Sequence, residues 1–270
     1  MAKIKYNIDH YKGARVIFTQ KDAGTVGVTC KYAMAGLKAG LRFFNLPSGF
    51  PLINIFIAPS RKEYDRLVAH LTKVPTSKGR LGQPQGHDLY LISPKAWPAD
   101  VHPDYLGRDG KCDRQVYRQF IGHEIVHMIE EQFSPKGAME IRPRWWSEGL
   151  AVYAAGQWKD RFTRRAMKED LSSGRFPGIA ELEGRNAYVW GWALLRHLEK
   201  RFGRKAFTRI MADSNTEDIL GFLKLNKTGF EKEWHRAIPE LLGPHLRSGK
   251  RQAGRRTSPQ PLTVYEQFNP

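Results

Sequence analysis

Two histidines and a glutamate near the middle of the chain have the spacing of a metal-dependent hydrolytic centre. Residues 123–127 read His-Glu-Ile-Val-His. Residues four apart lie on one face of an α-helix, so His123 and His127 can bind one ion together. Glu124 is one position further round, where it can reach a water on that ion. Two imidazoles and one further ligand suit zinc, so we expect one Zn²⁺ per chain, with Glu124 as the general base.

The residues around this motif favour a function for its polar side chains. An HExxH pattern also occurs by chance in helices that bind nothing. Here, however, apolar residues surround it, and a helix of this kind is expected to be buried. Unpaired polar groups in a buried position are strongly destabilising. The apolar neighbours are Ile121, Ile125, Val126, Met128 and Ile129.

A third ligand is required, and Glu148 is the candidate that the spacing favours. Twenty residues separate it from His127, enough for one helix to end near Phe133, a loop and an antiparallel return. Gly149 and Ala151 are small, so we expect the helix that carries Glu148 to approach the motif helix closely. A third histidine does not fit, because the metzincin pattern needs Gly and His at positions 130 and 133, where this chain has Glu and Phe.

Three segments in the same order resemble a known family, the gluzincin zinc peptidases, and in particular the peptidase-MA-like domains. HEIVH at 123–127 is followed by WWSEGLAVY at 145–153, as HExxH is followed by a Trp-containing Glu-Gly-Leu-Ala segment in that family. YVWGWALLRHLE at 188–199 is similar to the Tyr-x-x-Gly-x-Ala-Leu-Leu segment of gluzincin aminopeptidases. The resemblance covers about residues 120–203.

The resemblance implies an α+β, zincin-like (thermolysin-like) catalytic domain that hydrolyses peptide bonds in a peptide or protein substrate. It implies His123, His127 and Glu148 as metal ligands and Tyr188 as a hydrogen-bond donor to the tetrahedral oxyanion. It does not imply exopeptidase specificity. The Gly-x-Met-Glu-Asn segment that precedes HExxH in the aminopeptidases has no counterpart there, since Gly137–Glu140 follows the motif and Ile141 comes next.

Two pairs of residues near the motif have less specific interpretations. Glu130 and Glu131 follow His127 by three and four positions, so one of them could hydrogen-bond a histidine ring, although a solvated helix face is the simpler interpretation. Trp145 and Trp146 could line a substrate cleft, but we expect at least one of them to pack in the core.

The elements that must position these residues form an α/β part followed by a helical part. We expect one peptidase domain over 1–245, with an α/β subdomain at 1–113, a helical subdomain at 114–245, and a basic, disordered tail at 246–270. A small mixed sheet should cover the motif helix, and its edge strand should border the cleft. Strands are predicted at 15–19, 52–58 and 88–92, with a short edge strand within the loop 75–87. Helices are predicted at 23–45 (weakened by Gly36 and Gly40), 60–71, 115–132, 145–157, 160–173, 187–202, 204–212, 216–224 and 230–242, and a loop at 95–113.

The composition limits the remaining possibilities. The chain of 270 residues carries a net charge of +17, which nucleic acid or an acidic partner could use, although a basic soluble surface is the simpler interpretation. Residues 123–157 are the exception, with five acidic and three basic side chains. No apolar run approaches the roughly 18 residues of a membrane helix. The N-terminus lacks the apolar region of a signal peptide, so we expect a cytoplasmic protein in which Cys30 and Cys112 are free thiols.

Two alternatives to a zinc peptidase remain open from the sequence. The first is a non-proteolytic metal-binding module that uses a peptidase scaffold for interaction. The second is a basic protease associated with nucleic acid, although known proteases of that type use a third histidine as ligand, which this chain lacks near the motif.

Overall fold

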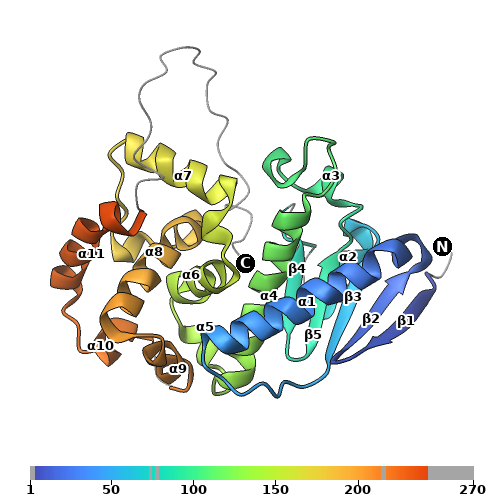
Figure 1. Ribbon diagram of the computed structural model, residues 1–270, viewed down its shortest axis with the longest axis horizontal. Helices are drawn as coiled ribbons and strands as arrows, with labels where there is room; N and C mark the ends of the chain where they lie inside the picture. Colours follow the sequence, from blue (N-terminus) through green and yellow to red (C-terminus); the bar gives the residue numbers. More distant parts are fainter. Residues whose placement is uncertain (1–3, 73–74, 77–78, 214–216, 243–270) are drawn as a thin grey trace, which may run out of the picture.

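The computed structural model describes residues 4–72, 75–76, 79–213 and 217–242, and its first half is built on a five-stranded mixed sheet (Figure 1). The strand order is β1-β2-β3-β5-β4, formed by β1 (Tyr6–Tyr11), β2 (Ala14–Thr19), β3 (Ile53–Ala58), β5 (Asp88–Ile92) and β4 (Gly82–Gln85). The three central strands are parallel, and each edge strand is antiparallel to its neighbour. The chain is therefore an α+β protein, as predicted.

Strand β1 is not among the predicted strands. It forms a hairpin with β2 across a turn in which Gly13 has φ 85°. It lies at the sheet edge with most of its side chains exposed, including Ile8 at 57%. Tyr6 and Ile8 alternate with Asn7 and Asp9, but the alternation is short and carries no run of buried apolar residues like that of the central strands.

The helices follow the predicted positions closely, with some differences. The loop predicted at 95–113 contains the short helix α3 and a 3-10 turn, the short helix α5 was not predicted, and helix 216–224 is reduced to α10. The helices predicted at 187–202 and 230–242 each begin three residues earlier, at Gly184 and Lys227. The predicted tail 246–270 lies outside the described residues. The helices are α1 (Ala23–Phe43), α2 (Arg61–Thr72), α3 (Trp97–Asp100), α4 (Arg114–Phe133), α5 (Ala138–Ile141), α6 (Arg144–Ala155), α7 (Arg161–Ser172), α8 (Gly184–Phe202), α9 (Lys205–Met211), α10 (Ile219–Phe222) and α11 (Lys227–Leu242).

Helix α4 is the central element, packed between α1 on one side and α6 on the other (Figure 1). Its N-cap is Asp113, whose carboxylate accepts from the backbone N–H groups of Gln115 and Val116 at 2.8 and 3.1 Å. A Cβ on Gly36 of α1 would lie 3.2 Å from the Cα of Gly122, and a Cβ on Gly122 would lie 3.4 Å from the Cβ of Ala155 on α6. Glycine at these positions therefore permits three helices to meet next to the HExxH motif.

Gly149 has a different partner from the one we predicted. We expected it to let α6 approach the motif helix, but it faces α8. A Cβ on Gly149 would lie 2.6 Å from the carbonyl carbon of Gly191, and a Cβ on Gly191 would lie 2.8 Å from the backbone oxygen of Trp145. The backbones of α6 and α8 are thus in direct contact, and this contact fixes the helix that carries Glu148.

The remaining general expectations concern thiols and membranes. Cys30 and Cys112 are free, as predicted. In the part of the chain that the structure describes, no helix combines the length and the apolar character needed to cross a bilayer.

We predict that Gly149→Ala lowers the free energy of unfolding by about 1–3 kcal/mol, because the new methyl group would overlap the backbone of α8. Gly27→Ala is the matched control, since it lies on an exposed part of α1 and a Cβ there meets nothing within 4 Å. That control should be stabilised by up to ~1 kcal/mol through helix propensity. Urea unfolding of the metal-free proteins measures both, and equal effects of the two changes would contradict the close contact.

Candidate metal centre

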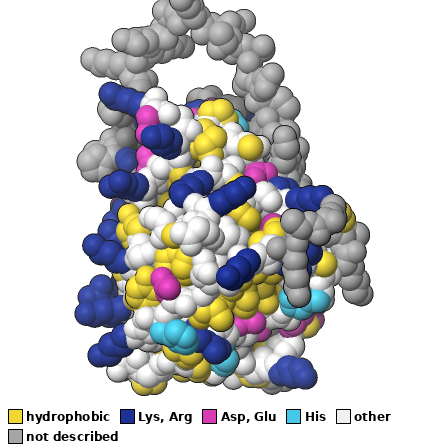
Figure 2. All heavy atoms as spheres, turned by 90° about the vertical axis from the view of Figure 1, so that its right-hand side faces the viewer, with side chains coloured by type: hydrophobic (Ala, Val, Ile, Leu, Met, Phe, Trp, Pro, Cys, Tyr) yellow, Lys and Arg dark blue, Asp and Glu magenta, His cyan; other side chains and the backbone are white. Residues whose placement is uncertain are grey.

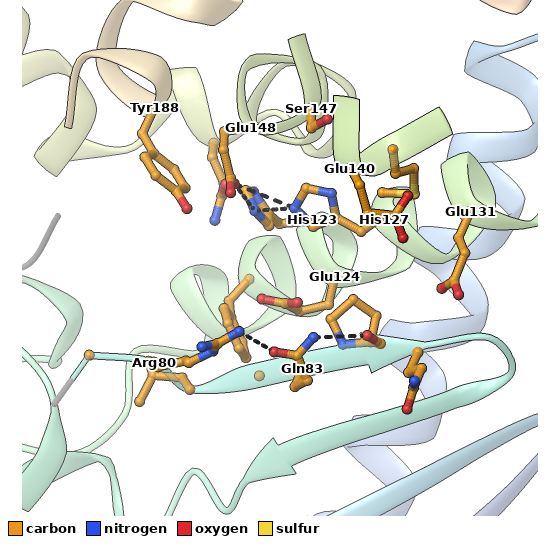
Figure 3. A pocket seen from close by; sticks show the side chains of 18 of the residues that line it. Arg80, Gln83, His123, Glu124, His127, Glu131, Glu140, Ser147, Glu148 and Tyr188 are labelled. Atoms are coloured by element: carbon orange, nitrogen blue, oxygen red, sulfur yellow. Dashed lines mark hydrogen bonds and ion pairs between the residues drawn. The ribbon is translucent and has the colours of Figure 1, made fainter. Parts of the chain in front are cut away.

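Helices α4 and α6 bring the side chains of His123, His127 and Glu148 together at one point (Figure 3). The Nε2 atoms of the two histidines are 3.0 Å apart. Glu148 Oε2 lies 3.3 Å from Nε2 of His123 and 3.4 Å from Nε2 of His127. The structure therefore places the three predicted ligands where one ion could touch all of them.

The chemistry of these atoms fits a cation. Two facing ring nitrogens cannot both carry a proton, and Glu148 Oε2 is buried without a hydrogen bond of good geometry among the described residues. Burial would lower the pKa of His127, but the Glu148 carboxylate outweighs it and raises that pKa to about 9. Burial would raise the pKa of Glu148, but the two histidines hold it well below its usual value. The cluster thus attracts positive charge, and two imidazoles with one carboxylate suit Zn²⁺.

Gln157 orients the first histidine, and sequence reasoning did not single it out. Its Oε1 lies 2.7 Å from Nδ1 of His123. An amide oxygen can only accept, so this contact keeps the proton on Nδ1 and leaves a lone pair on Nε2. Gln157 follows Gly156, which ends α6 with φ 74° and whose carbonyl accepts from Gln119 of α4 at 3.0 Å. Only the folded turn brings this glutamine to the motif, so no local signal could have identified it.

Glu124 points from α4 towards the edge strand β4 (Figure 3). It is buried, and a Cβ on Gly82 would lie 2.9 Å from its carboxylate carbon. Burial raises its pKa, and the charges of His123 and His127 oppose this rise. A carboxyl group whose pKa is raised towards neutrality is suited to accept and release a proton.

Tyr188 of α8 lies on the other side of the ligands. Its ring is nearly parallel to that of His123, with 6.0 Å between ring centroids and 14° between planes. It is buried, and burial, together with the Glu148 carboxylate, raises its pKa well above the usual value. The phenol therefore keeps its proton and can act as a hydrogen-bond donor.

Glu130 differs from the solvated helix face that we preferred for it, whereas Glu131 agrees with that interpretation. Glu130 is fully buried, where its Oε1 accepts from Trp146 Nε1 at 2.7 Å and pairs with Arg142 at 3.2 Å. Glu131 is exposed, as predicted, and accepts from the backbone N–H of Gly86 at 2.7 Å. Trp145 and Trp146 of α6 are both buried in the core, where we expected at least one of them.

A cleft of about 710 Å³ contains the cluster, Glu124 and Tyr188. Strand β4 forms one wall, as we predicted for the sheet's edge strand, and the segment from Ser134 to Glu140 lies at one end. Trp97, Val101 and Tyr105 also line the cleft. An extended chain could therefore lie along β4 beside the three ligands.

No protein-family model matches this chain, and no curated protein matches it significantly. The assignment of the site therefore depends on its own residues and geometry.

We predict that Gln157→Leu lowers the affinity for zinc about 10- to 100-fold, the usual effect of losing the partner that orients a ligand. Competition with a chromogenic chelator measures this affinity without any assay of activity. Gln157→Glu should restore most of it, because its carboxylate can still accept from Nδ1. Wild-type affinity in Gln157→Leu would show that the contact does not orient His123.

Proposed function

We propose that this chain is a zinc-dependent metallopeptidase with a zincin-like catalytic domain. The observation that carries the proposal is the meeting of His123, His127 and Glu148 in a cleft where Glu124 faces an edge strand. The mixed sheet, with an antiparallel edge strand beside the HExxH helix, supports the finer fold assignment. Peptides commonly bind to such edges as an added strand.

His123, His127 and Glu148 would hold the ion. Zinc bound by such ligands supplies Lewis acidity, which polarises a carbonyl group and makes water a stronger acid. Glu124 accepts a proton from the attacking water at its carboxylate and later donates it to the leaving amine. The raised pKa of Glu124 suits this role, because a carboxylate with a raised pKa is a stronger base than a free one.

Tyr188 donates a hydrogen bond to the oxygen of the scissile carbonyl as negative charge develops on it. Its rigid position against the His123 ring means that little reorganisation accompanies this step. Arg144 Nη2 lies 3.4 Å from Glu148 Oε1, so the oxygen of Glu148 that faces away from the histidines also has a partner. The carboxylate is thereby held in one orientation.

The face of the molecule at its β1 end gives no support to the nucleic-acid alternative. On the face at the β1 end of the molecule, Lys and Arg side chains are spread out with hydrophobic and uncharged side chains between them (Figure 2). An extended basic groove is the usual feature of a protein that follows a phosphate backbone. This face does not present one.

We predict that Glu124→Gln retains about one zinc per chain and loses roughly 10²–10⁴-fold in turnover, the usual contribution of general acid–base catalysis. His123→Ala, by contrast, should lose the metal together with activity. Zinc content by mass spectrometry and cleavage of a quenched fluorescent peptide library, with and without chelator, separate the two variants. Full activity of Glu124→Gln would exclude the peptidase mechanism, and an inactive, zinc-loaded wild type would favour the non-proteolytic module.

We predict that Tyr188→Phe reduces kcat by ~10²–10³-fold, the typical cost of one missing oxyanion donor. The ring remains, so packing, zinc content and KM should change little. Turnover close to that of the wild type would assign Tyr188 to core packing alone.

A further inference from the structure

We propose that Arg80 recognises a carboxylate of the substrate, so that this cleft selects peptides that carry an acidic group on one side of the cleaved bond. The inference rests on the proposed function. The carboxylate can belong to an Asp or Glu side chain or to the free C-terminus of the peptide.

Arg80 is a half-buried cation in the cleft wall that forms no ion pair among the described residues, although the Glu124 carboxylate is close enough to feel its charge. It lines the cleft and donates to the side-chain oxygen of Gln83 (Figure 3). The ion pairs found among the described residues do not include it. Its guanidinium offers more donors than Gln83 can use, and the planar fork of arginine matches a carboxylate.

The backbone of Arg80 is fixed, so the guanidinium is presented from a defined position. Its carbonyl accepts from Arg61 Nη1 of α2 at 2.6 Å. Arg61 in turn pairs with Asp100 of α3 at 3.3 Å. A recognition group held this way loses less conformational freedom on binding than one on a loose loop.

The edge of β4 determines where a peptide would lie relative to Arg80. Ile92 N donates to Leu81 O at 2.8 Å, which makes Leu81 and Ile92 a hydrogen-bonded pair of the antiparallel ladder. Such pairs alternate along the strand, so the backbone groups of Gly82 and Pro84 point away from β5. Proline has no N–H, and the Pro84 carbonyl already accepts from Gln83 Nε2 at 3.1 Å.

Gly82 is therefore the residue of β4 that can both donate to and accept from a bound peptide. It also lies against Glu124, as the distances above show. A peptide residue paired with Gly82 would lie beside the general base. Arg80 is two residues away, roughly 7 Å along an extended chain, which places its guanidinium near a neighbouring residue of the peptide rather than at the cleaved bond.

The charge of the cleft differs between its two ends. Glu131 and Glu140 lie at the end away from Arg80 (Figure 3). Lys136, close to Glu140 in the sequence, also lines the cleft. That end has a net negative charge, which disfavours an anion. Among the described residues that line the wall at β4, Arg80 is the cation that suits a peptide carboxylate.

The test is a selection of bound peptides that does not need turnover. Zinc-loaded Glu124→Gln protein is incubated with a random octapeptide pool, made once with free C-termini and once with C-terminal amides, and the retained peptides are identified by mass spectrometry. We expect enrichment of Asp or Glu at a fixed position, or of free acids over amides. The first result assigns the carboxylate to a side chain, and the second assigns it to the terminus.

Arg80→Gln in the same Glu124→Gln background should abolish this enrichment. It should weaken binding of the selected peptide about 10- to 100-fold, the range for a charge-assisted hydrogen bond, while the Asn, Gln or amide analogue binds as before. Arg118→Gln, on an exposed part of α4 outside the cleft lining, removes the same charge and should leave the selection unchanged.

Several outcomes overturn the inference: no retained peptide, no acidic enrichment, enrichment that persists in Arg80→Gln, or equal loss of binding for acidic and neutral peptides. The proposed function is judged separately by the turnover of wild-type protein. Acidic selection by a protein that cleaves no peptide would keep Arg80 as a recognition residue and reject the peptidase.

Discussion

The structure depends on one constraint: three atoms with lone pairs must meet within a few ångströms although they belong to two different helices. Atoms of this kind repel one another unless a cation or a proton lies between them. Burial increases the repulsion because the interior screens charge poorly. The fold must therefore hold α4 and α6 in one relative position before any ion binds, which is the task of the packing around them.

That position is held from three directions. Gly122 allows α1 and α6 to touch α4 one residue before His123, and Gly149 brings the backbone of α8 against α6 one residue after Glu148. Further along α4, Glu130 contacts Trp146 of α6 and Arg142, which precedes α6, and so connects α4 with α6. The Arg142 guanidinium also donates to the backbone oxygens of Ile210, Met211 and Asp213, so the end of α9 is included in the same buried network. Both contacts to Glu130 use Oε1, whereas its Oε2 is buried without a partner among the described residues, so the charge is compensated mainly by the Arg142 guanidinium.

The parts of this arrangement that were predictable from sequence are those that local periodicity determines. His123 and His127 share a helix face whether the helix is buried or exposed, because the helical period alone places them there. The predicted strands with apolar runs form the centre of the sheet. The exposed strand β1 alternates apolar and polar residues only briefly and has no apolar run. The partner of Gly149 could not be inferred either, because a small residue indicates a close approach but not which helix approaches. Glu130 was placed on a solvated face because charge usually implies exposure, and only the position of Arg142 reverses that expectation. Gln157, Gly82 and Arg80 acquire their roles solely from tertiary structure.

Two carboxylates of the cleft illustrate how surroundings give the same side chain different roles. Glu148 faces two imidazoles that hold its pKa low, so it remains ionised and can act as a ligand. Glu124 faces strand β4 at Gly82. Burial raises the pKa of Glu124, and the charges of His123 and His127 offset only part of that rise. Environments that separate the pKa values of neighbouring acids in this way are typical of sites where one group binds and the other transfers protons. Arg80 also acts on Glu124, since its charge is among those that lower the pKa.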